Sequence, residues 1–225
     1  FFSSAACCGG VFLRLLCGNR IVFVNLHNYM PMKRVIYALA ALVALCCACS
    51  NEEEVLPQQR EKLVSYLESS HAPALVEESE ADKEARQPFY SLSGSTVYRY
   101  IETYYAPGRE SRAEVTSSSK VTITFRAYEF AYSNITDSTF PFYSNDPLLE
   151  QAYLEAGLTP GSFEPLTLDM RGDILKGLRL ALLGCRAGDE VEAYMTYNMA
   201  FGDRNFGTIP RESPIAWFFT VESVE

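Results

Sequence analysis

Hydrophobic and polar residues alternate along several segments of the second half of the chain. The alternation is clear in segments 96–105, 120–132 and 215–221, and it returns in the shorter segments 166–170 and 190–197. In the first of them, Val97, Arg99 and Ile101 lie on one side, and Tyr98, Tyr100 and Glu102 lie on the other. A period of two residues predicts β-strands with two distinct faces.

Two segments between these strands have the spacing of helices instead. Segment 174–183 repeats its apolar residues with a helical period and is followed by Gly184, a residue typical of helix ends. Segment 146–156 predicts a short helix with Pro147 in its first turn, inside a long loop at 138–164. The order of elements predicts an α+β fold, in which an antiparallel sheet packs on one short central helix and an extra helix lies in the long loop.

The first 49 residues differ in charge from the rest. The 225-residue chain has a formal net charge of −9, but residues 1–49 contain four basic residues and no acidic one. Segment 1–31 begins with Phe1 and has no clear period, so we expect an unstructured upstream extension of the gene, with a genuine extra segment as the alternative. From Met32, the basic pair Lys33-Arg34 and the apolar run 35–45 are typical of a signal peptide, over residues 32–48.

At the end of this signal Ala48 precedes Cys49, and an acidic tail follows the cysteine. This arrangement resembles the cleavage site of a bacterial lipoprotein. The resemblance implies that the Cys49 thiol carries the lipid, with Cys46 or Cys47 as alternative acceptors. The acidic tail also resembles the surface-export signal of lipoproteins in the Bacteroidetes. We therefore expect a protein anchored by lipid to the bacterial outer membrane, periplasmic or surface-exposed; an ordinary secreted protein is the alternative.

Segment 49–90 is polar and charged. It predicts a tether between the anchor and the folded domain, which we expect at 91–225. Within it, segment 57–69 has the pattern of a short helix with Leu63, Val64 and Leu67 on one face, and a dimerisation helix is the alternative interpretation.

Composition excludes several classes of function. After residue 49 the chain has 15 basic and 28 acidic residues, a balance that repels phosphate backbones, so we expect no nucleic-acid partner. The two histidines, His27 and His71, lie outside the well-patterned half, which excludes a Ser-His-Asp triad or a histidine metal site there. Cys185 is the one cysteine after residue 49, so the globular part has no disulfide. We expect Cys185 to be packed and inert, and we expect no cofactor.

Segment 172–221 contains a series of short pieces in a fixed order: Ile174-Leu175-Lys176-Gly177-Leu178, Ala181-Leu182, Cys185-Arg186-Ala187-Gly188, Ala200-Phe201-Gly202 and Ile209-Pro210-Arg211-Glu212-Ser213-Pro214-Ile215-Ala216-Trp217. In order and spacing these pieces resemble the core of FKBP-type peptidyl-prolyl isomerases. With looser agreement before them, the likeness covers about residues 92–224. It implies an FKBP-like fold and an enzyme that rotates X-Pro bonds of proline-containing polypeptides to assist their folding outside the cytoplasm. A weakly active or inactive chaperone-like binding module is the alternative.

The resemblance also assigns the residues of a substrate pocket. It places Phe125, Ile174, Leu175, Leu178, Phe201, Ile209 and Trp217 in an apolar cleft, with Leu166 or Leu168 as its floor and Asp137 at the position of the family's pocket aspartate. The backbone N–H of Leu175 would donate to the substrate carbonyl. Phe201 stands where the family has a tyrosine, and Leu178 stands where it has a tryptophan, so the implied activity is weakened. Asp169 and Asp173 are expected to be solvated or capping residues rather than a catalytic carboxylate pair.

Overall fold

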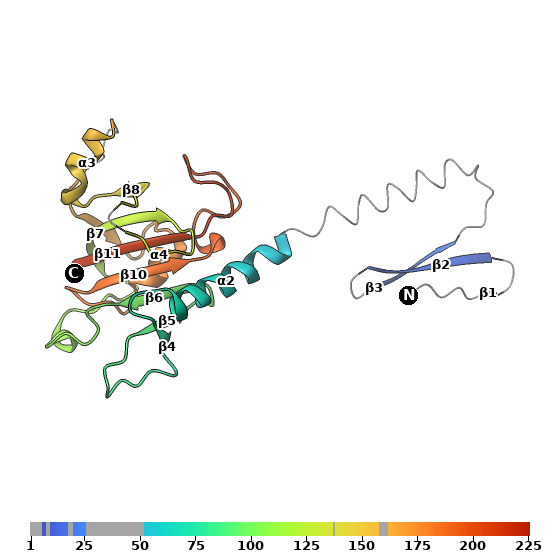
Figure 1. Ribbon diagram of the computed structural model, residues 1–225, viewed down its shortest axis with the longest axis horizontal. Coiled ribbons are helices and arrows are strands. Elements are labelled where there is room, and N and C mark those ends of the chain that lie inside the picture. The colour runs from blue at the N-terminus through green and yellow to red at the C-terminus, as the bar shows by residue number, and fades with distance from the viewer. Residues whose placement is uncertain (1–5, 8–9, 18–19, 26–51, 137, 158–161) are drawn as a thin grey trace. The chain divides into compact units, whose positions relative to one another are not determined.

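A computed structural model gives the fold of the chain (Figure 1) and describes residues 6–7, 10–17, 20–25, 52–136, 138–157 and 162–225. The chain divides into two compact units, Phe1–Glu54 and Val55–Glu225. The signal peptide expected at 32–48 and the lipid acceptor expected at Cys49 lie outside the described residues. Among the described residues, no helix combines the length and the apolar character that a bilayer crossing requires.

The first unit contains a small antiparallel sheet where we expected no structure. Strands β1 (Ala6–Cys7), β2 (Gly10–Cys17) and β3 (Arg20–Asn25) pair in that order. Strands β2 and β3 are rich in β-branched and large apolar residues, which favour strands. Gly18 and Asn19 alone separate them, and so short a connection favours a hairpin. Whether segment 1–31 is translated stays a prediction.

The second unit is built on an eight-stranded sheet. Its strands are β4 (Val76–Glu77), β5 (Phe89–Ser93), β6 (Val97–Ile101), β7 (Lys120–Glu129), β8 (Tyr143–Ser144), β9 (Leu166–Asp169), β10 (Glu190–Met195) and β11 (Ile215–Val224). They follow the order β4-β5-β6-β10-β11-β7-β8, and β9 also pairs with β7. All pairs are antiparallel except the short parallel pair of β4 and β5. The predicted α+β class is thus confirmed, with a mixed rather than a purely antiparallel sheet.

One face of this sheet packs on the predicted central helix. Helix α4 (Lys176–Leu182) buries Leu178, Ala181 and Leu182 against the aliphatic side chains of β6, β7, β10 and β11. The predicted extra helix is present as α3 (Glu150–Glu155), preceded by the 3-10 turn η2 (Pro147–Leu149). The Asp146 side chain caps this turn by accepting a hydrogen bond from Leu148 N at 2.9 Å. Two further 3-10 turns are η1 (Arg109–Ser111) and η3 (Tyr197–Met199).

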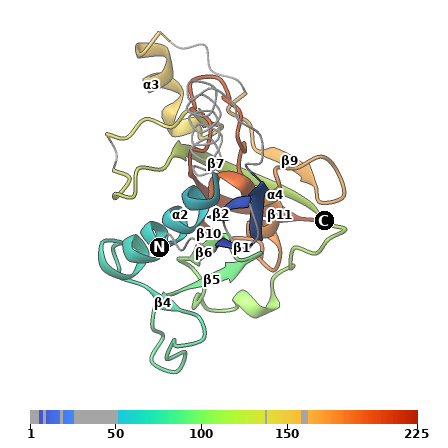
Figure 2. The same cartoon turned by 90° about the vertical axis from the view of Figure 1, so that its right-hand side faces the viewer.

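The opposite face of the sheet is covered by a helix that we expected within a tether. Helix α2 (Glu52–Ser69) is longer than the predicted helix at 57–69, and it packs on the sheet with Leu63, Tyr66 and Leu67 buried. Figure 2 shows α2 and α4 on opposite sides of the strands. The prediction of a polar tether over 49–90 and of a domain starting at 91 is therefore wrong. The physical reason is that the face of the sheet under α2 is built from tyrosines, which bury their rings while their hydroxyls keep polar partners.

Candidate functional site

The residues assigned to the pocket come together on the α4 side of the sheet. Phe125 on β7 and Trp217 on β11 lie on neighbouring strands, with ring centroids 4.8 Å apart. Leu178 on α4 and Ile209 in the loop before β11 are buried in the same apolar cluster. These four residues span 93 positions of the sequence, from 125 to 217. Alternation brings Phe125 and Trp217 to one face because β7 and β11 pair in register, and helix α4 and the loop bring Leu178 and Ile209 to the same cluster.

The remaining assigned residues lie at the edge of this cluster. Ile174, Leu175 and Phe201 are partly buried and pack against it, as do Leu166 and Leu168 of β9. Leu175 is the N-cap residue of α4. Asp137 lies outside the described residues, so its role stays a prediction.

A glycine allows the helix to approach the turn that leads to Phe201. A Cβ atom on Gly177 would lie 2.5 Å from Met195 Sδ and 2.6 Å from the Met199 carbonyl oxygen. Any side chain at this position would push α4 away from β10 and η3. Gly177 therefore fixes the distance between α4, which carries Leu178, and the segment that carries Phe201.

A loop carrying two parallel aromatic rings borders the cluster. The rings of Phe201 and Phe206 lie parallel with centroids 4.1 Å apart, and Phe206 is exposed. Phe206 and Ile209 exchange two backbone hydrogen bonds of 2.9 Å across a tight turn, in which Gly207 has a φ of +58°. A two-residue turn of this kind requires glycine at its first position. The turn returns Ile209 to the core while Phe206 stays at the surface.

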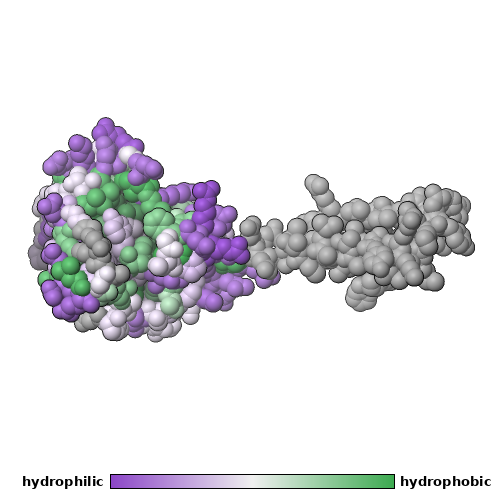
Figure 3. Space-filling view, turned by 90° about the horizontal axis from the view of Figure 1, so that it is seen from above, coloured by the Kyte–Doolittle hydropathy of each residue, from purple (hydrophilic) through white to green (hydrophobic). Residues whose placement is uncertain are grey.

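Three aromatic residues of the site were missed by the sequence reasoning. Phe206 stacks on Phe201, Phe142 lies 6.0 Å from Phe201, and Tyr143 lies 4.9 Å from Phe125 between ring centroids. Phe142 and Tyr143 belong to the long loop with the extra helix. The sequence offered one signal for them: large aromatic residues stand in loops that are otherwise rich in polar residues. Loops often carry binding residues, so such aromatic residues are candidates for a site. Figure 3, which views the second unit from above and so from the side of α3 and β8, shows hydrophobic residues gathered among hydrophilic ones there.

The cluster contains one buried polar atom that has no partner. Trp217 is 5% exposed, and among the described residues its Nε1–H is the buried side-chain polar group left without a hydrogen bond. Buried donors are nearly always paired, so an unpaired one calls for an explanation. The site therefore offers an apolar surface with a single free side-chain donor inside it.

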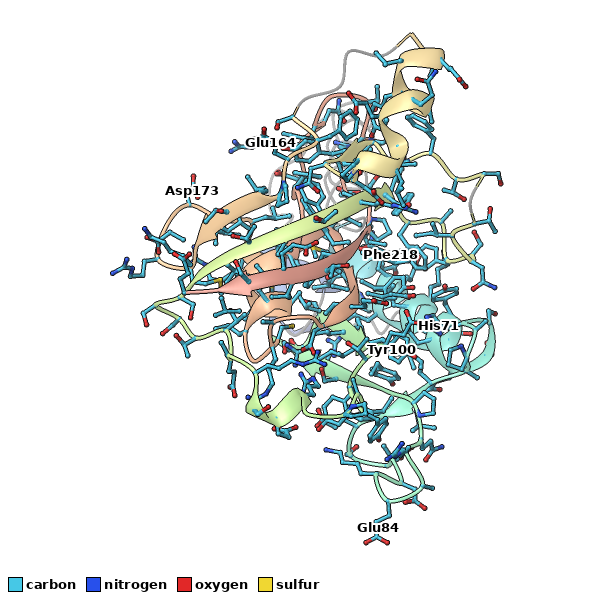
Figure 4. All side chains as sticks on the ribbon, turned by 90° about the vertical axis from the view of Figure 1, so that its left-hand side faces the viewer. His71, Glu84, Tyr100, Glu164, Asp173 and Phe218 are labelled. Atoms are coloured by element: carbon cyan, nitrogen blue, oxygen red, sulfur yellow. The ribbon has the colours of Figure 1, made fainter. Side chains whose placement is uncertain are left out.

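Three other candidate residues among the described ones, Asp169, Asp173 and Cys185, have the surroundings of structural or solvated residues. Asp169 is bound by Arg171 at 3.1 Å, and hydrogen bonds from the Arg171 side chain and backbone lower the pKa of its carboxyl. Asp173 is exposed and lies at the periphery (Figure 4), as expected for a solvated residue. Cys185 is fully buried, as expected, and burial raises the pKa of its thiol to about 11. In the described part of the chain, no three His, Cys, Asp or Glu residues come together as metal ligands.

Comparisons with known proteins return likenesses of fold only. No family model and no curated protein matches the chain. A peptidyl-prolyl cis-trans isomerase from Pseudomonas syringae is similar at 12% identity and a TM-score of 0.48, over 78% of this chain and 97% of that one. FkpA from Escherichia coli is similar at 13% identity and a TM-score of 0.43, over 86% of this chain and 71% of that one. The N-terminal domain of FKBP42 from Arabidopsis thaliana is similar at 12% identity and a TM-score of 0.40, over 60% of this chain and 89% of that one. Likenesses at this level decide nothing about the activity of this chain.

Proposed function

We propose that the chain is a peptidyl-prolyl cis-trans isomerase that binds X-Pro segments in the cluster on the α4 side of the sheet. The observation that carries the proposal is an apolar cluster with one unpaired donor, Trp217 Nε1–H. A prolyl amide has no N–H, so it brings carbonyl acceptors to a site but no backbone donor. An apolar site with a free donor is complementary to such a ligand.

The chemistry of this reaction requires no acid or base. Rotation about an X-Pro bond crosses a barrier of about 18–20 kcal/mol because the twisted amide loses its resonance. The uncatalysed reaction takes tens to hundreds of seconds, so a modest acceleration already matters for folding. An apolar site that excludes water and holds the proline ring favours the twisted form without transferring a proton. The absence of histidine from the sequence after His71 is compatible with this mechanism.

Each site residue then has a role that follows from its position. Leu178 supports the base of the site, and Phe125, Trp217 and Phe201 form its aromatic walls. Ile174, which precedes α4, and Ile209, in the loop before β11, close it from two sides. Trp217 Nε1–H donates to the substrate carbonyl, and this compensates for the hydroxyl that Phe201 lacks. The backbone N–H of Leu175 is a second donor, as the family resemblance implies.

The first test measures the cis/trans exchange rate of a prolyl peptide by NMR with the full chain. We expect an acceleration that is nearly flat from about pH 6 to pH 8, since no assigned side chain titrates in that range, rather than the bell of an acid-base pair. The variant Phe201→Tyr should raise the rate because it restores a hydroxyl donor. If no X-Pro peptide is accelerated and Phe201→Tyr does not rescue the activity, the chain is not an isomerase.

A second test isolates the indole donor. Trp217→Phe removes Nε1–H. The smaller ring loses packing contacts, which destabilises the fold, but the variant no longer buries an unpaired donor, which stabilises it. The unfolding free energy should therefore change little. The value of kcat/KM should fall roughly fivefold, the worth of one hydrogen bond of about 1 kcal/mol. Phe219→Leu is the matched control, because it replaces a neighbouring buried ring on β11 by a smaller side chain and removes no polar atom. Equal losses of kcat/KM in both variants would exclude a role for the indole N–H.

The alternative function is a binding module for unfolded chains. The missing hydroxyl at Phe201 and the aliphatic Leu178 favour it, because both keep an apolar site while they remove features of an isomerase. It predicts that prolyl peptides bind to the full chain without any change in their exchange rate. Titration of a labelled prolyl peptide by fluorescence anisotropy, beside the NMR rate, distinguishes the two functions.

The proposed cellular setting is a lipid anchor on the bacterial outer membrane. It is supported by Lys33-Arg34, the apolar run 35–45 and the Ala48-Cys49 pair. Cys49→Ser should release the protein from the membrane fraction, and the intact mass of the mature protein should show cleavage before residue 49. Retention in the membrane after Cys46, Cys47 and Cys49 are all replaced would contradict the anchor.

A further inference from the structure

A buried glutamine of α2 binds two segments that flank the proposed site. Gln59 is 6% exposed, and both atoms of its side-chain amide are used. Its Nε2 donates to the Glu212 carbonyl oxygen at 2.6 Å, and its Oε1 accepts from Tyr197 N at 3.0 Å. The two partners lie 153 and 138 residues away along the chain, so these bonds join α2 to a distant part of the fold.

The two partners, Tyr197 and Glu212, lie at the two ends of the segment that contains Phe201, Phe206 and Ile209. Tyr197 begins η3, which leads to Phe201, and Glu212 precedes β11. Within the segment, Gly202 N donates to the Tyr197 carbonyl oxygen at 2.9 Å, and Glu212 N donates to the Gly202 carbonyl oxygen at 2.9 Å. Gln59 therefore completes a closed set of hydrogen bonds from Tyr197 through Gly202 to Glu212.

The backbone at one end of this set is strained. Glu212 has a φ of +59°, a region that a residue with a Cβ atom seldom adopts. Such a conformation persists only where its surroundings fix it. The bond from Gln59 Nε2 to the Glu212 carbonyl, together with Glu212 N on Gly202, fixes this residue on both sides.

We propose that Gln59 is a positioning residue, which holds the loop 202–212 in place so that Phe201, Phe206 and Ile209 meet the proline site. Helix α2 is on this account part of the functional unit of the protein and sets the geometry of a site on the other side of the sheet. The proposal rests on the proposed isomerase function, and its test includes a readout that does not depend on that function.

The experiment compares two substitutions of Gln59 with the same substitutions at its neighbour. Gln59→Met keeps the length of the side chain but leaves Tyr197 N and the Glu212 carbonyl unpaired. Gln59→Glu keeps an acceptor for Tyr197 N, loses the donor, and directs a carboxylate at the Glu212 carbonyl. Gln58→Met and Gln58→Glu are the controls, because Gln58 is exposed on the same turn of α2. At pH 7 both Gln59 variants should lose roughly tenfold in kcat/KM, as expected for unpaired buried groups, and both controls should lose none.

The pH profile of Gln59→Glu separates positioning from a general loss of packing. A protonated carboxyl has one O–H donor and an acceptor, so it can restore both bonds. Burial raises the pKa of such a carboxyl, and kcat/KM should therefore recover as the pH falls below about 6. The carboxyls of Glu212 and of Glu129, which accepts from Ser213 Oγ at 2.9 Å, belong to the segments that meet there. Measurement of Gln58→Glu over the same pH range gives the contribution of these other carboxyls, which is then subtracted. The kcat/KM of Gln59→Met should not recover at low pH.

Hydrogen exchange of backbone amides gives the readout that is independent of activity. In Gln59→Met and in Gln59→Glu at pH 7, the amides of Phe206, Ile209 and Glu212 should lose protection, while those of β7 and β11 keep it. Wild-type kcat/KM in both Gln59 variants, or unchanged protection in the loop, would overturn the proposal. If the wild type itself is inactive, the isomerase function fails, and the exchange data alone decide whether Gln59 positions the loop.

Discussion

The two faces of the sheet are covered in different ways. The α4 side is mainly aliphatic, with buried valine, isoleucine and alanine side chains from β6, β7, β10 and β11 and the leucines of α4 around three aromatic rings, Phe125, Trp217 and Phe219. The α2 side is aromatic, with Tyr66 of the helix packed edge-on against Phe130 and Tyr194, at centroid distances of 4.9 and 5.5 Å. One sheet thus supports two cores of different composition.

The difference shows in the polar atoms of each side. On the α2 side, Tyr90 donates to Glu68 Oε1 at 3.0 Å, and Tyr194 donates to Glu192. His71 lies beside Tyr100 (Figure 4), with 5.4 Å between the ring centroids, and it also binds Glu192 Oε2 at 2.9 Å. On the α4 side, the described polar atom without a partner is Trp217 Nε1. A core whose hydrogen bonds are satisfied suits a structural role, and a core with a free donor suits a binding site.

The largest expected effect concerns a buried ion pair in the loops beside the α4 side. Arg109 binds both carboxylate oxygens of Asp189 at 2.8 and 2.7 Å, and both side chains are buried. Asp189→Ala should lower the unfolding free energy by about 3–5 kcal/mol, because a buried arginine then lacks a counter-charge. Chemical denaturation measures it. Glu110→Ala, which removes an exposed carboxylate 3.7 Å from the same guanidinium, should cost less than about 0.5 kcal/mol. Equal costs would mean that the pair is not buried in solution.

The next prediction compares the two faces directly. Leu182 on α4 and Leu67 on α2 are both fully buried, so Leu182→Ala and Leu67→Ala should each lower the unfolding free energy by about 2–5 kcal/mol. Glu61→Ala, at an exposed position of α2, is the control and should have almost no effect. If α2 were a tether after all, only Leu182→Ala would destabilise the protein.

A smaller effect follows from the histidine of the α2 side. Burial lowers the pKa of His71, but hydrogen bonds to Glu192 and to the Pro73 carbonyl outweigh it, and the net shift is upward. The titratable groups that face His71 are Glu192, Glu102, Tyr66, Tyr100 and Tyr194. A raised pKa in the folded state means that the stabilisation is fully present below the unfolded value of about 6.5 and is lost as the pH rises through the folded value.

The unfolding free energy should therefore decrease as the pH rises above about 6.5, and His71→Gln should flatten this slope. Urea denaturation at a series of pH values measures both. Glu102, whose pKa is raised by burial and by Glu190 and Glu192, acts in the same direction but from a lower pH, so it should leave a residual slope in the variant. A slope that is identical with and without His71 would exclude the histidine as its source.

The smallest effect is expected at the thiol beneath α4. Cys185 is fully buried, its Sγ donates to the Ala181 carbonyl at 3.2 Å, and burial raises its pKa to about 11. A thiol reagent at pH 7.5 should leave Cys185 unlabelled in the native protein, because the reactive thiolate is scarce there and access is closed. Peptide mapping by mass spectrometry separates this residue from the six cysteines before residue 50. Rapid labelling would show that the α4 side opens readily in the native protein.

The sequence alone determined the elements whose apolar period matches their buried face. Alternation in 120–132 and 215–221 corresponds to β7 and β11, and the helical spacing in 174–183 contains α4. In these segments the alternating aliphatic residues face the α4 side, as the period predicts, while Tyr128 and Ala216 of the same strands are buried on the other face. The same signals predict that Phe125, Leu178 and Trp217 are buried, as they are. Their assignment to one substrate pocket came from the family resemblance, and it stays a prediction.

Only the tertiary structure decided what covers the other face. Tyr98 and Tyr100 alternate with aliphatic residues and were assigned to the second face of their strand, yet both are buried under α2. A tyrosine has an apolar ring and a polar tip, so its burial depends on whether a distant segment supplies a cover and a partner for the hydroxyl. The contacts of Gln59 with Tyr197 and Glu212 and the unpaired donor of Trp217 have the same origin. They depend on residues far apart in the sequence, and the periodicity of a local segment does not indicate which distant residues will be its neighbours in the fold.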